Sequence, residues 1–228
     1  MTYRTSSTLK RLFIYALMVF FALLAIVPVY LMLINATRTN AQINEGISLI
    51  PGNNTLNNWK NLTNRSFQIW QGFYNSAIIA VLSTILNVYF SSMTAYGIHV
   101  YRFKGRNFLW GLILVVIMLP GTLGFIGFYQ FMAKMKLTNS FIPLIIPSIA
   151  AAGTVLFLKQ YMESILSTEL IDAGRIDGAG EFRIFNTIMM PILLPAIATQ
   201  CIFSFVGSWN NFMGPFVLLS DQRKYTLP

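Results

Sequence analysis

Long apolar runs that contain no Asp, Glu, Lys or Arg dominate the pattern of hydrophobic and polar positions along this chain. A helix needs about 20 mostly apolar residues to cross roughly 30 Å of hydrocarbon. Five runs meet this requirement: 12–33, 76–100, 108–131, 140–158 and 187–219. The pattern therefore predicts an all-α fold, a polytopic transmembrane helical bundle with five spans.

The composition agrees with a chain that lies in a membrane. Of its 228 residues 55% are hydrophobic and only 10% are charged, whereas soluble globular domains carry about 25% charged residues. This excludes a disordered chain and argues against a cytosolic enzyme. With one Cys and one His, we expect no disulfide framework and no metal site. No nucleophile–base pair stands out, so we expect no catalytic residues.

The basic residues, which give a net charge of +9, flank the apolar runs and so indicate orientation in a bilayer rather than binding to nucleic acid. Three bases lie in the N-terminal tail, and Arg102, Lys104 and Arg106 lie in the turn after the second run. Both segments should be cytoplasmic by the positive-inside rule. We therefore expect a multi-pass protein of the cell membrane with a cytoplasmic N-terminus. Its expected parts are a cytoplasmic tail at 1–11, a first span at 12–33, an extracytoplasmic segment at 34–75 and a transmembrane core at 76–228.

The chain carries no nucleotide-binding phosphate loop of the form G-x-x-x-x-G-K-[ST]. Its apolar runs also hold no ionisable side chain except His99, near one end of the second run. Ion-coupled carriers usually keep such a group at depth to bind or relay the ion. If the chain takes part in active transport, the energy must come from another polypeptide or from an ion gradient.

An acidic loop precedes the last apolar run: five of the seven acidic residues lie between Glu163 and Glu181. Ser167 can cap a helix there, and the Asp177-Gly178 step can end it, because Gly adopts the left-handed conformation without steric cost. A second amphipathic stretch then begins at Glu181. The loop is thus predicted to be a cytoplasmic helix–turn–helix. It either docks into a cleft on a partner or is a solvated loop that only caps the bundle.

The residues of this loop resemble a known motif. Asp172-Ala173-Gly174 stands for Glu-Ala-Ala, Arg175-Ile176-Asp177-Gly178-Ala179 follows it, and Ile188-Met189-Met190-Pro191 completes it. The segment 163–191 resembles the EAA coupling loop of ABC-importer permease subunits. Further pieces are similar to the carbohydrate-importer type: Asn75-Ser76, Ala95-Tyr96-Gly97, Met118-Leu119-Pro120, Phe203-Ser204-Phe205, Ser208-Trp209-Asn210-Asn211-Phe212 and Lys224-Tyr225-Thr226-Leu227-Pro228.

The resemblance implies partners and a set of coupling residues. The partners would be a second permease subunit, a cytoplasmic ABC ATPase dimer, an extracytoplasmic solute-binding protein and membrane lipid. The chain itself would bind no cofactor, and ATP would be used by the partner ATPase. Members of this family normally have six spans, so we expect the last span to be missing here. The implied ATPase-coupling residues are Glu169, Asp172, Ala173, Gly174, Asp177, Gly178 and Ala179.

A second group of residues could contact the solute. Sugars are neutral and favour aromatic platforms together with amide and hydroxyl partners. That mixture occurs in the last run, at Ser208, Trp209, Asn210, Asn211 and Phe212, although hydrogen bonding between helices would explain it equally well. We expect a permease subunit of a binding-protein-dependent ABC importer for a sugar or oligosaccharide. The alternatives are an ABC permease for a non-sugar solute and a membrane assembly protein that transports nothing.

Overall fold

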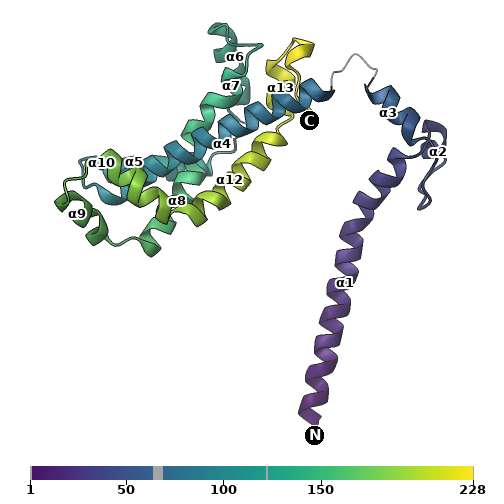
Figure 1. Ribbon diagram of the computed structural model, residues 1–228, viewed down its shortest axis with the longest axis horizontal. Coiled ribbons are helices and arrows are strands. Elements are labelled where there is room, and N and C mark those ends of the chain that lie inside the picture. Colours follow the sequence, from purple (N-terminus) through teal and green to yellow (C-terminus); the bar gives the residue numbers. More distant parts are fainter. Residues whose placement is uncertain (1, 64–68, 122, 228) are drawn as a thin grey trace. The chain divides into compact units, whose positions relative to one another are not determined.

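The computed structural model describes residues 2–63, 69–121 and 123–227, and it divides the chain into two compact units, Met1–Phe67 and Gln68–Pro228. Throughout these described ranges every regular element is helical, which confirms the predicted all-α class (Figure 1). Pro228, the last residue of the C-terminal motif, lies outside the described residues.

The first unit consists of one long helix and a short polar cap. Helix α1 (Thr2–Ala36) is followed by α2 (Asn40–Asn44) and α3 (Thr55–Thr63). The buried guanidinium of Arg38 donates hydrogen bonds to the carbonyl oxygens of Gln42 and Gly46, the latter at 3.0 Å. Arg38 thereby fastens α2 to the end of α1. The apolar side chains along α1 are almost all exposed, so the helix requires an apolar environment such as lipid.

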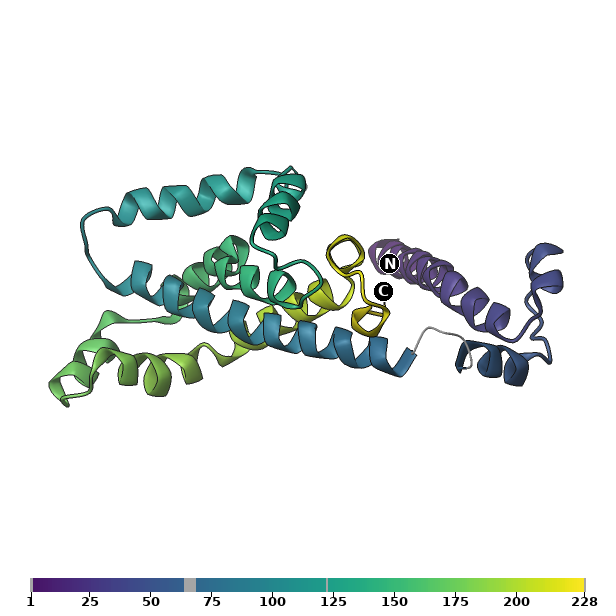
Figure 2. The same ribbon diagram turned by 90° about the horizontal axis from the view of Figure 1, so that it is seen from above.

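The second unit is built around α4 (Ile69–Val100), which lies against α8 (Ala152–Ile165) and α12 (Leu194–Trp209) (Figures 1 and 2). The other elements of its membrane region are α5 (Arg106–Met118), α6 (Phe125–Lys134), α7 (Ile142–Ile145), the 3-10 turn η1 (Ile146–Ala150), α13 (Met213–Leu218) and the 3-10 turn η3 (Gln222–Lys224). Helix α4 therefore contacts both the fourth and the fifth of the predicted apolar runs.

Small and polar side chains let α4 approach its neighbours closely. Ala80, Ser91 and Ala95 are fully buried along it, and small residues allow helix backbones to come together in a membrane. The amide of Asn87 donates to Ser204 Oγ on α12 at 3.0 Å and accepts from Ser91 Oγ at 3.2 Å. These hydrogen bonds satisfy polar groups that would otherwise be costly inside an apolar bundle.

The backbone of the predicted third span, 108–131, is not one continuous helix. Helix α5 ends at Met118 and α6 begins at Phe125, with Pro120 between them. Among the described residues three helices are long and apolar enough to cross a membrane: Lys10–Ala36, Ile69–Val100 and Ile142–Ile165. A fourth span is possible if the bent pair Glu181–Ile192 and Leu194–Trp209 counts as one. The lengths of the charge-free apolar runs predicted five spans, but run length alone does not show where the backbone breaks.

Three hydrogen bonds, which we call the C-terminal clasp, hold the C-terminal segment against the beginning of α4. The amide of Asn75 donates to the carbonyl oxygens of Arg223 and Tyr225, both at 2.9 Å. The hydroxyl of Ser76 accepts from the backbone N–H of Leu227 at 2.9 Å. Two motifs at opposite ends of the second unit's sequence thus form one structural contact.

We predict that Asn75→Ala destabilises the second unit by about 1–3 kcal/mol, because the buried Asn75 side chain and its two hydrogen bonds to the carbonyl groups of Arg223 and Tyr225 are lost. The thermal midpoint in detergent and the rate of proteolysis near Arg223 would measure this effect. Asn107→Ala, a change of an exposed amide on α5, is the control. Equal stability of the two variants would show that the clasp contributes nothing.

Candidate functional site

The acidic loop folds as a helix with a defined stop. Helix α9 (Thr168–Ile176) starts after the extended residue Ser167 and ends at Asp177. Gly178 has a φ of 76°, and its N–H donates to the Arg175 carbonyl, while the N–H of Ala179 donates to the Gly174 carbonyl, both at 3.0 Å. This pair of bonds is a Schellman motif. The prediction that the Asp177-Gly178 step ends the helix is confirmed.

The second limb of the loop packs back onto α9. It comprises α10 (Glu181–Arg183), the π-helical turn η2 (Ile184–Met189) and α11 (Met190–Ile192). Gly174 is buried against this limb: a Cβ there would lie 3.0 Å from Ile188 Cδ1 and 3.3 Å from Ile184 Cγ1. The missing side chain at Gly174 therefore allows the two limbs to pack closely.

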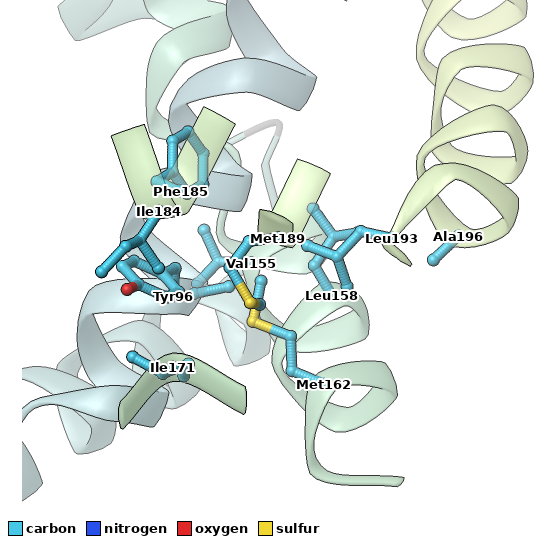
Figure 3. Close-up of a cluster of buried hydrophobic side chains, with 11 residues drawn as sticks. Tyr96, Val155, Leu158, Met162, Ile171, Ile184, Phe185, Met189, Leu193 and Ala196 are labelled. Atoms are coloured by element: carbon cyan, nitrogen blue, oxygen red, sulfur yellow. The ribbon is translucent and has the colours of Figure 1, made fainter. Parts of the chain in front are cut away.

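An apolar cluster joins the loop to the bundle (Figure 3). Ile171 of α9 and Ile184 of η2 are almost completely buried. The ring of Phe185 lies 5.5 Å from that of Tyr96 on α4. The cluster continues along α8 and the end of the second limb, through Val155, Leu158, Met162, Met189, Leu193 and Ala196. The loop is consequently anchored to the bundle by side chains from α4 and α8.

A polar junction centred on Glu181 lies beside this cluster. Glu181 Oε1 accepts from Arg175 at 2.7 Å, and Arg175 also pairs with Asp172 at 2.9 Å. Glu181 Oε2 accepts from the hydroxyl groups of Tyr101 and, at 3.3 Å, Tyr96. The hydrogen bond to Glu181 raises the pKa of Arg175 above its usual range. Burial and the contact with Glu181 raise the pKa of Tyr101, so its phenol stays protonated and can donate.

Most of the predicted coupling residues lie on the exposed side of the loop. Those exposed are Glu169, Asp172, Ala173, Asp177 and Gly178, whereas Ala179 is half-buried and Gly174 is inside. Two apolar side chains that were not among the predicted coupling residues lie beside them: Ile176 is 86% exposed and Phe182 is 68% exposed. An exposed surface of small, acidic and apolar residues is suited to contact with another protein.

The second predicted group lies near the end of α12, beside an apolar hollow of ≈ 400 Å³. Trp209 and Asn210 line this hollow, while Asn211 accepts from the backbone N–H of Gly214 at 3.1 Å, and Phe212 stacks on Phe216. The hollow's other walls come from α4 and α12: Phe73, Ala77, Val81, Phe205 and Val206.

The ring of Trp209 connects the two walls of this hollow. Its centroid lies 5.1 Å from the ring of Phe73 on α4 and 5.7 Å from that of Phe205. From the sequence, Phe73 was expected in the extracytoplasmic segment at 34–75, and Phe205 was given no role at a site. Within the described ranges no three His, Cys, Asp or Glu side chains are grouped to hold a metal ion. The hollow therefore offers aromatic faces and one amide.

Comparison with known proteins gives consistent results. Residues 100–223 match the family "Binding-protein-dependent transport system inner membrane component". The arabinooligosaccharides transport system permease protein AraQ of Halalkalibacterium halodurans is 37% identical over 212 residues, which cover 92% of this chain and 76% of that protein. AraQ of Bacillus subtilis is 31% identical over 219 residues, covering 93% of this chain and 78% of that protein.

The fold also matches a solved structure. A chain of a bacterial ABC transporter involved in the import of the acidic polysaccharide alginate superimposes with a TM-score of 0.85 at 23% identity. The match covers 97% of this chain and 78% of that one. The two chains thus share a fold.

We predict that Gly174→Val destabilises the loop by about 1–3 kcal/mol, because the added atoms would overlap Ile188 and Ile184. Gly180→Val is the matched control, since Gly180 has a φ of −67° and its Cβ would meet nothing within 4 Å. Thermal unfolding in detergent measures both variants. If they unfold at the same temperature, close packing at Gly174 is not what holds the limbs together.

Proposed function

The chain belongs to the family of inner membrane components of binding-protein-dependent transport systems, and from this we propose that it is a permease subunit that carries a sugar or oligosaccharide across the cytoplasmic membrane. The relatives named as arabinooligosaccharide permeases support the solute class. The aromatic hollow supports it as well, because the C–H faces of sugar rings stack on aromatic side chains. As a family member the chain is a transport protein and not an enzyme.

The proposed assembly contains several other polypeptides. A second permease subunit completes the path, an extracytoplasmic binding protein delivers the solute, and two cytoplasmic ABC ATPases supply the energy. The absence of a phosphate loop from the sequence supports a separate ATPase. In this arrangement the tail 1–11 and the loop 163–191 are cytoplasmic, the segment 34–75 is extracytoplasmic, and the core 76–228 forms the permease half.

The exposed side of the acidic loop is the proposed ATPase contact. Asp172 already pairs with Arg175, so Glu169 and Asp177 are the exposed carboxylates that we assign to bases on the ATPase. Ala173, Ala179 and the bend at Gly178 allow a close fit. The exposed side chains of Ile176 and Phe182 would lose contact with water on docking, which favours association.

Helix α4 is the proposed route by which the loop acts on the solute path. At one end Tyr96 contacts the Glu181 junction, and at the other end Phe73 lines the aromatic hollow. The helix has 32 residues and is thus about 48 Å long at 1.5 Å per residue. A movement of the docked loop would shift α4 as one piece. Coupling would arise because the two ends prefer different positions in the two states of the transporter.

We predict that Glu181→Gln lowers uptake at least about fivefold while the ATPase still docks. The loop keeps its apolar anchor but loses the negative charge that pairs with Arg175 and strengthens the hydrogen bonds from Tyr96 and Tyr101. Uptake is measured in membranes that contain the whole transporter. Docking is measured by cross-linking from Ala179→Cys in a Cys201→Ala background. Glu45→Gln, a change of an exposed acid in the first unit, is the control.

The two measurements separate two possible failures. If Ala179→Cys never captures an ATPase, the proposed docking surface is wrong. If docking and uptake both stay normal in Glu181→Gln, the surface stands but the junction does not transmit the movement.

We predict that Trp209→Ala lowers sugar uptake roughly two- to tenfold, because an aromatic contact is worth about 0.5–1.5 kcal/mol. Trp209→Phe should retain most of the uptake. Phe203→Ala on the same helix is the control, since Phe203 is exposed and does not line the hollow. A panel of labelled sugars that includes arabinooligosaccharides measures the effect, and uptake of a non-sugar solute alone would contradict the proposed solute class.

A further inference from the structure

A second apolar hollow lies between α4 and α5, away from the aromatic one. It has a volume of ≈ 490 Å³, which is within the roughly 300–1,000 Å³ typical of sites for small molecules. Thr94, Gly97, Ile98 and Tyr101 line it from α4 and the turn that follows, and Phe103, Leu109, Leu112 and Ile113 line it from the other side. The hollow shares Tyr101 with the Glu181 junction, but its other lining residues have no role proposed above.

The hollow is open because of the residues that form it. A Cβ at Gly97 would meet no atom within 4 Å, so α4 leaves free space there. No residue of α5 is buried, and Leu109 and Leu112 are 42% and 50% exposed. In a membrane such an apolar surface is covered by an acyl chain or by another protein, because it offers water no hydrogen-bonding partner.

The turn after α4, which contributes Tyr101 and Phe103 to the lining of this hollow, is strongly basic. Arg102, Lys104 and Arg106 are three of its five residues from 102 to 106, and the two lining residues Tyr101 and Phe103 alternate with the first two bases. The chain reverses direction between α4 and α5 (Figure 2), and Gly105 in this turn has a φ of 93°. Within the part of the chain that the structure describes, none of these three bases forms an ion pair.

An apolar hollow beside unpaired bases is complementary to one class of molecule. An anionic phospholipid carries acyl chains and a negative phosphate group, and basic pockets between membrane helices bind such headgroups. A zwitterionic lipid would fill the hollow equally well but would bring no net charge to the bases. A helix from a protein partner would fill it too, but it would leave the charge of the turn without a counterpart.

We propose that this site binds one anionic phospholipid, with an acyl chain between α4 and α5 and its phosphate group on Arg102 and Lys104. The bound lipid would support α5, whose own side chains bury little surface. The site requires only that the chain lies in a membrane, so it does not rest on the solute or on ATPase docking.

The test follows lipid that stays bound to the full chain, purified with its transport partners. Phosphatidylglycerol and phosphatidylcholine are supplied in equal amounts, and the lipid retained per protein is measured by native mass spectrometry. The unaltered chain should retain phosphatidylglycerol in preference. Gly97→Leu, which fills the hollow, should lower that retention at least about fivefold. Gly111→Leu on α5, which also has open space at its Cβ but does not line the hollow, should not.

The charge is tested separately. The double variant Arg102→Gln and Lys104→Gln should lower retention of phosphatidylglycerol roughly tenfold and leave phosphatidylcholine unchanged. The double variant Lys134→Gln and Lys136→Gln, at the end of α6, should have no effect. Equal retention of both lipids by the unaltered chain would overturn the proposal. So would a Gly97→Leu variant that keeps its lipid but loses the second permease subunit, because the hollow would then be a protein interface.

Discussion

The carboxylate of Glu181 links the acidic loop to the end of α4, the central helix of the bundle. It accepts from Arg175 of α9 and from the hydroxyl groups of Tyr96 and Tyr101 at the end of α4. The Glu181 side chain is 43% exposed, so these hydrogen bonds fix its orientation rather than offset a loss of hydration. Arg175 is placed by α9, and the two tyrosines are placed by the end of α4 and the residue that follows it, so the position of the loop depends on both elements.

Apolar packing and the polar junction have different roles in holding the loop. The cluster around Ile171, Ile184 and Phe185 supplies most of the buried surface, and such packing is not directional. The hydrogen bonds to Glu181 are directional, so they fix the orientation of the loop relative to α4. A docking element needs both properties, since it must stay attached and must also transmit an orientation.

Local features of the site could be predicted from the sequence, whereas contacts between distant residues could not. The helix stop at Gly178 follows from the backbone preference of one residue, and the structure confirms it. The contact of Glu181 with Tyr96 and Tyr101 joins positions at least 80 residues apart, and no periodicity pairs them. The same limit applies to the aromatic hollow, where Trp209 was predicted but its partner Phe73 was not assigned to the site.

The clasp on Asn75 has a consequence for biosynthesis. The carbonyl groups that accept from its amide lie 148 and 150 residues further along the chain. Until the ribosome has translated those residues, the side-chain amide of Asn75 therefore lacks these two acceptors. A nascent chain that stalls before Arg223 keeps this defect, so the fold distinguishes an interrupted translation product from one that has been read through to its clasping residues.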